Sequence, residues 1–108
     1  MERAQRAVDV NPEDPRAWIL GAGCLHTLGQ KKEAYRWAEK SIEVSPESSS
    51  TAYNFACLLA RTGEHERAID QLENAVRLGG RNKLYYETDV DFDSLREHPR
   101  FQRLMDSI

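Results

Sequence analysis

The chain has 108 residues, of which 40% are hydrophobic and 31% are charged, and its formal net charge is −3. This length fits one compact domain, and this composition is that of a folded, water-soluble chain rather than a disordered or membrane-embedded one. Mixed charges without a basic patch, and apolar runs far shorter than a membrane span, lead us to expect neither nucleic acid nor a membrane as a partner.

Identical residues recur 34 positions apart, which indicates a duplicated structural unit. The recurring pairs are Pro12 and Pro46, Leu25 and Leu59, Gly29 and Gly63, and Ala34 and Ala68. Within each unit, apolar residues spaced three and four apart predict two amphipathic helices. The sequence therefore predicts an all-α chain of consecutive helix hairpins.

In chain order, residues 2–14 come first and predict the second helix of a partial repeat, because Ala4, Ala7 and Val8 have the spacing of the later packing residues. One complete unit follows over residues 15–48, with helices expected at 15–28 and 32–44. The next unit covers residues 49–80, with helices expected at 50–62 and 64–78. Asp14 before Pro15 predicts a capped helix start, and Gly29 and Gly63 predict helix ends that need a left-handed residue.

The segment 81–108 departs from the repeat and predicts a C-terminal cap, which completes a single domain over residues 1–108. Its sequence predicts a short helical turn after Asp91 and a helix opened by Pro99. That last helix has Phe101, Leu104, Met105 and Ile108 on one face. We expect this face to cover the last repeat, because the end of a solenoid otherwise exposes apolar surface. We also expect Tyr85 and Tyr86 to fill the junction.

These residues resemble the tetratricopeptide repeat over roughly residues 2–80. The first unit places Trp18, Ala22, Leu25, Ala34 and Pro46 at that motif's characteristic positions, and the second matches through Ala56, Leu59, Ala68, Leu72 and Ala75. Departures from the motif are Gly21, Ala38, Ser41 and Gly80. The tail, with Asp89 to Arg96 and then His98 to Phe101, is similar to a segment that closes such arrays in bacterial proteins. The resemblance implies antiparallel hairpins in a right-handed superhelical solenoid of about two and a half repeats plus a cap.

The resemblance also implies a concave groove that binds a protein or peptide and is lined by the first helix of each repeat. From the first unit it places there Arg16, Ile19, Leu20, Gly23, His26 and Thr27. From the second it places there Ser50, Tyr53, Asn54, Cys57, Ala60 and Arg61. Tyr53, Asn54 and Arg61 offer a rigid ring, an amide and a guanidinium for gripping a peptide. The alternative is that Tyr53 packs against the neighbouring repeat and Arg61 is merely solvated.

Other chemistry has weaker support in the sequence. Asp89, Asp91 and Asp93 match the opening of a calcium loop, but Ser94 and Arg100 stand where that loop needs glycine and glutamate. We therefore expect these carboxylates to be solvated and to cap a helix instead. No spacing of cysteine and histidine is typical of zinc, no arrangement is typical of an enzyme, and Cys24 and Cys57 are expected to be free thiols. We therefore expect no cofactor, no metal and no catalysis. The start of the chain lacks an apolar signal region, so we expect a cytoplasmic location.

Two functions remain open at this point. The first is a peptide-binding or protein-binding adaptor that uses the groove. The second is self-association, as a homodimer through the open N-terminal edge, or a regulatory segment of a larger bacterial protein such as a kinase, cyclase or transcription regulator. In the subfamily that binds chaperone tails, a lysine and an asparagine stand where this chain has Ile19 and Gly23, so we expect no recognition of those tails.

Overall fold

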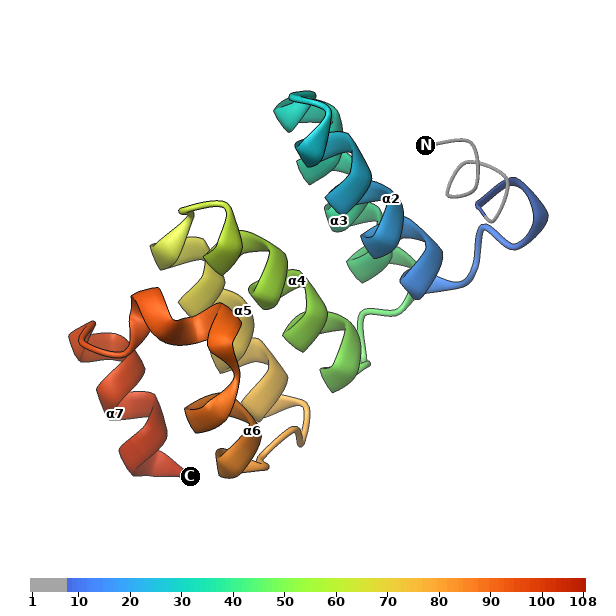
Figure 1. Ribbon diagram of the computed structural model, residues 1–108. Coiled ribbons are helices and arrows are strands. Elements are labelled where there is room, and N and C mark those ends of the chain that lie inside the picture. The colour runs from blue at the N-terminus through green and yellow to red at the C-terminus, as the bar shows by residue number, and fades with distance from the viewer. Residues whose placement is uncertain (1–7) are drawn as a thin grey trace.

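The computed structural model describes residues 8–108, and within this range every regular element is a helix. Residues 8–10 are helical, but Ala4 and Ala7 of the predicted partial repeat lie outside the described residues. The elements that follow, drawn in Figure 1, are α2 (Pro15–Thr27), α3 (Lys31–Val44), α4 (Ser49–Arg61), α5 (His65–Arg77), α6 (Lys83–Thr88), the 3₁₀ helix η1 (Val90–Leu95) and α7 (Pro99–Ser107). The four predicted repeat helices agree with α2 to α5 within one residue at each end, and the all-α helical solenoid is confirmed.

The ends of the repeat helices have the expected physical causes. Asp14 caps α2 by accepting from the amide of Arg16, and Ser48 caps α4 by accepting from the amide of Thr51. Gly29 and Gly63 follow the helix ends with φ of 82° and 86°, a conformation that side chains disfavour. Each glycine turns the chain so that the next helix runs back antiparallel.

Short side chains let the two helices of each hairpin approach closely. Ala22, Ala34 and Ala38 are fully buried between α2 and α3, and Ala56 and Ala68 are fully buried between α4 and α5. Large rings fill the remaining volume, and Trp18 and Trp37 meet edge to face with their centroids 5.1 Å apart. Figure 1 shows the two hairpins side by side, with α2 and α4 on one side and α3 and α5 on the other.

The hairpins are joined through a tyrosine on α3. The hydroxyl of Tyr35 donates to the hydroxyl oxygen of Thr62, 2.8 Å away, just beyond the end of α4. The guanidinium of Arg67, on α5, lies 5.1 Å from the centre of the Tyr35 ring. The second hairpin therefore contacts the first through both of its helices.

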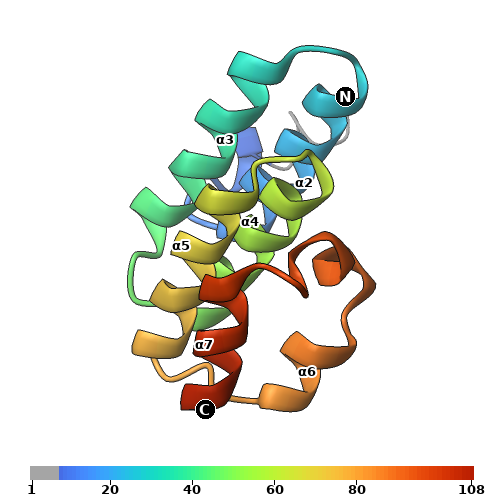
Figure 2. The same cartoon turned by 90° about the vertical axis from the view of Figure 1, so that its left-hand side faces the viewer.

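The C-terminal segment covers the open end of the second hairpin, with α7 beside α5 and η1 against α4 (Figure 2). Phe92 and Leu95 of η1 are fully buried, and Phe101 and Met105 of α7 are nearly so. Tyr86 fills the junction as expected, whereas Tyr85 does not, because 64% of its surface is exposed. The predicted apolar face of the last helix thus packs against the repeat.

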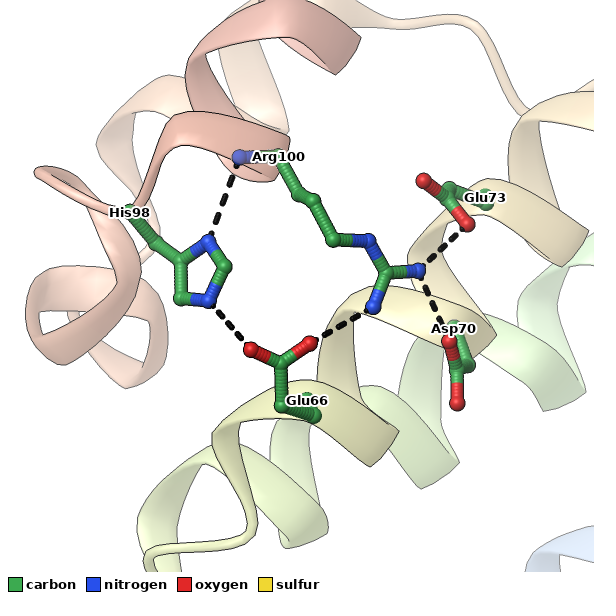
Figure 3. Close-up of polar contacts among 5 residues, drawn as sticks. All are labelled: Glu66, Asp70, Glu73, His98 and Arg100. Carbon is green, nitrogen blue, oxygen red and sulfur yellow. Dashed lines mark hydrogen bonds and ion pairs between the residues drawn. The ribbon is translucent and has the colours of Figure 1, made fainter.

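A single arginine fastens α7 to α5 (Figure 3). The guanidinium of Arg100 pairs with Glu66 at 2.8 Å and with both Asp70 and Glu73 at 2.7 Å. The Nε2 atom of His98 lies 2.6 Å from Glu66, and its Nδ1 atom accepts from the amide of Arg100. These contacts join the start of α7 to one face of α5.

Candidate functional site

The face formed by α2 and α4 has a hollow of about 700 Å³ between the two helices. Most of its lining comes from α2 and the residue that follows it, and the rest comes from the C-terminal end of α4. The lining residues are Ile19, Leu20, Gly23, Cys24, His26, Thr27, Leu28, Leu58, Arg61 and Thr62. Six of the twelve predicted groove residues thus meet in one hollow: Ile19, Leu20, Gly23, His26, Thr27 and Arg61.

The hollow is apolar over most of its surface. Leu20 and Leu28 are 62% and 59% exposed, and both line the hollow. The hydroxyl of Thr27 donates to the carbonyl of Gly23, so it presents mainly its methyl group. The Nε2 atom of His26 is buried and has no hydrogen-bond partner among the described residues. Such a surface favours apolar side chains of a partner.

Gly23 keeps the hollow open. A Cβ atom built on this glycine would have no heavy atom within 4 Å, so the space above it is free. Gly23 lies within α2, where a glycine costs about 0.5–1 kcal/mol of stability relative to alanine. The open space beside the backbone of Gly23 therefore comes with a lower stability of α2.

The corresponding face of α4 is covered by the chain's own cap. The hydroxyl of Tyr53 donates to Oδ2 of Asp89 at 2.7 Å, and the Sγ atom of Cys57 lies 3.8 Å from the same oxygen. One turn further, Nε of Arg61 lies 4.0 Å from Oδ1 of Asp91. Tyr53, Cys57 and Arg61 thus form a stripe along α4 that faces Asp89 and Asp91 at the start of η1.

Burial is the main cause of the altered acidity of two groups in this stripe. It raises the pKa of the Tyr53 hydroxyl, and the hydrogen bond to Asp89 raises it further. It also raises the pKa of the Cys57 thiol, with a further contribution from the charge of Asp89. Both groups therefore stay protonated at neutral pH and act as donors to Asp89.

The donor atoms of Cys57, Asp89 and Asp91 all lie within 4.8 Å of one another. A metal would need the thiolate of Cys57, which its raised pKa disfavours, and Asp89 already accepts from Tyr53 and from the amide of Asp91. The arrangement has the chemistry of an internal contact between the cap and α4.

The remaining predicted residues are placed apart. Ser50, Tyr53 and Asn54 line a second hollow of about 640 Å³ between the start of α4 and α6. Arg16, at the start of α2, pairs with Asp14 at 3.0 Å and lines neither hollow. The twelve residues expected from the sequence therefore do not form one groove, because six line the hollow between α2 and α4 and three line the hollow beside the cap.

Sequence reasoning missed the acidic residues that cover α4. The sequence predicts helix-capping carboxylates at these positions rather than calcium ligands, and Asp89 does cap η1 by accepting from the amide of Asp91. Their contacts with α4 were not predicted, and the only available signal was their place in a segment expected to cover the last repeat. The part played by Leu28 was also missed, because a leucine just before a helix-ending glycine reads as a core residue. The alternative for Tyr53 was packing against the neighbouring repeat, whereas its ring packs against Tyr86 and Phe92 of the cap.

Comparison with known protein families gives one match, to the family described as tetratricopeptide repeat, over residues 15–48 and 49–78. These two stretches coincide with the hairpins α2–α3 and α4–α5, and together they cover more than half of the chain. No curated protein matches the chain. No helix among residues 8–108 has both the length and the apolar character needed to cross a membrane.

Proposed function

The chain belongs to the tetratricopeptide-repeat family, and from this we propose that it binds a peptide or a helix of a protein partner in the groove between α2 and α4, without catalysing a reaction. Repeats of this family are in general protein–protein interaction modules and are typically non-catalytic. What is specific to this chain is the place of binding and the part of the groove that is available.

The observation that carries the proposal is the hollow of about 700 Å³ that both repeats line. It lies open at Gly23, and it displays the apolar side chains of Leu20 and Leu28 to a partner. Pockets that bind small molecules and short segments have volumes of about this size. The corresponding face of α4 is less available, because the cap already contacts it.

A peptide-display selection tests this proposal. We expect random peptides that are enriched on the protein to bind the Gly23→Ala variant as well, because one methyl group leaves most of the hollow open. The same peptides should lose binding to Gly23→Phe, because a ring at this open position would occupy part of the hollow. Equal binding to Gly23→Phe, or no enriched peptide, would count against the groove between α2 and α4.

Self-association through the N-terminal edge is the alternative function, and it makes a different prediction. Of the residues named for that edge, Ala4 and Ala7 lie outside the described residues, and Val8 is already 95% buried within one chain. Light scattering over a range of concentrations separates the two functions. A monomer that binds the selected peptides would support the adaptor, whereas a stable dimer would favour the alternative.

A further inference from the structure

Acidic side chains are absent from the two helices that line the open hollow. The helices α2 and α4 contain no aspartate or glutamate in their combined sequence, although the chain has 18 such residues. The paired helices differ: α3 carries Glu33, Glu39 and Glu43, and α5 carries Glu66, Asp70 and Glu73. Among the four repeat helices, the carboxylates therefore lie on the second helix of each hairpin, and none comes from the residues that line the hollow.

One guanidinium stands at the rim of the hollow and is only loosely paired. Arg61 lines the hollow, and its side chain is 53% exposed. Its contact with Asp91 uses Nε at 4.0 Å, the outer limit of an ion pair, and no other polar partner is found in the described part of the chain. The two terminal nitrogens are thus left to meet a carboxylate in the bidentate manner that guanidinium favours.

The dimensions of the hollow limit what can fill it. Along α2 its lining runs from Ile19 to Leu28, which at 1.5 Å per residue is about 14 Å. An extended peptide covers this length with about four residues. Leu20 and Leu28, near the two ends, favour aliphatic side chains at both ends of such a segment.

We infer that the hollow between α2 and α4 selects a short aliphatic segment that carries one acidic side chain, which pairs with Arg61. This inference rests on the proposed function and adds the chemistry of the partner. The carboxylate is placed on a side chain within the segment, because the lining has a single guanidinium and no lysine or asparagine beside it to hold a chain end. Charge complementarity of this kind contributes chiefly to specificity.

Three synthetic peptides test the inference. Each has leucines on both sides of one central residue, which is glutamate, glutamine or lysine, and each is acetylated and amidated so that no terminal charge remains. Fluorescence anisotropy with the full chain should give the tightest binding for glutamate and the weakest for lysine, with about a tenfold difference between the two. The glutamate peptide should also weaken as salt is raised, since screening acts on exposed charges.

Two variants test whether the peptides bind in the hollow and pair with Arg61. Arg61→Glu should reverse the order of the glutamate and lysine peptides, whereas Gly23→Phe should abolish binding of all three. An unchanged order in Arg61→Glu, or equal binding of the three peptides to the unmodified chain, would overturn the inference. The proposed function would survive that result if displayed peptides still lost binding to Gly23→Phe. Both would fail together if no peptide of any charge distinguished Gly23→Phe from Gly23→Ala.

Discussion

The groove faces of α2 and α4 occupy the same register, 34 residues apart, and yet they have opposite surroundings. Ile19, Gly23 and Thr27 of α2 border an open hollow. The corresponding Tyr53, Cys57 and Arg61 of α4 face the acidic segment of the cap. The α4 face, with the larger side chains and stronger donors, is in contact with the chain itself. The α2 face, small and apolar, is left for another molecule.

A residue's position in the repeat therefore determines the helix face on which it lies. It does not determine whether that face is free to bind a partner. Groups that can hold a partner's peptide, such as the Tyr53 hydroxyl, can equally hold the chain's own cap. The comparison separates two kinds of position: those where a change should affect stability, and those where it should affect binding. Four experiments test this separation and the attachment of the cap, and they are given in order of decreasing effect.

Phe92→Ala should have the largest effect on stability. Phe92 is fully buried and its ring contacts those of Tyr53, Tyr86 and Phe101. Its truncation should lower the free energy of unfolding by about 3–5 kcal/mol, measured by urea denaturation. The control is Leu20→Ala on the open face, which should change stability by less than about 0.5 kcal/mol while weakening peptide binding. Similar losses of stability in both variants would remove the distinction between the two faces.

Gly80→Ala should destabilise the chain, whereas the same change at Gly23 should stabilise it. A Cβ atom at Gly80 would lie 3.0 Å from Cβ of Ser49, 3.1 Å from the carbonyl oxygen of Ala75 and 3.2 Å from the hydroxyl of Tyr86. We expect a loss of about 1–3 kcal/mol from this overpacking. Gly23→Ala, in open space, should gain about 0.4–1 kcal/mol. Thermal denaturation should therefore move in opposite directions for the two variants.

Tyr53→Phe should affect the cap more than the binding of a partner. The change removes the hydroxyl that donates to Asp89 but keeps the ring between Tyr86 and Phe92. We expect a loss of about 1 kcal/mol in the free energy of unfolding, because a carboxylate loses one of its donors. Affinity for peptides in the α2–α4 hollow should stay unchanged. A stable Tyr53→Phe variant with weakened binding would return Tyr53 to the partner-binding surface.

Protonation of Glu66 in acid should weaken the attachment of α7 to α5. We expect this change to have the smallest effect on the free energy of unfolding. Hydrogen bonds from His98 and Arg100 hold the pKa of the Glu66 carboxyl below its ordinary value. Because the pKa is lower in the folded state, this contribution is present above the pKa of the unfolded chain and is lost as the pH falls through the folded value. Urea denaturation of wild type and Glu66→Gln should differ at pH 7 and converge in acid. A constant difference at every pH would exclude this role.

Much of the fold could be predicted from the sequence, because it depends on local signals. The 34-residue offset, the alanines that allow close packing and the glycines after each first helix all act within a hairpin. The cap was predicted as a covering element from the apolar spacing of Phe101 and Met105. The binding surface was less predictable, since the contact of Asp89 with Tyr53 joins residues 36 positions apart through a segment that does not follow the repeat. No periodicity in the sequence encodes such a contact.

The hydrogen bond from Tyr35 to Thr62 has a consequence for how the chain opens in its native state. The second hairpin is held by this bond on one side and by the cap on the other, whereas among the described residues the first hairpin is joined to the rest mainly on the side of α4. The first hairpin should therefore unfold locally more often than the second. Amide protons of α2 and α3 should exchange with solvent faster than those of α4. A molecule seated in the hollow would join α2 to α4 and should slow exchange in α2 the most.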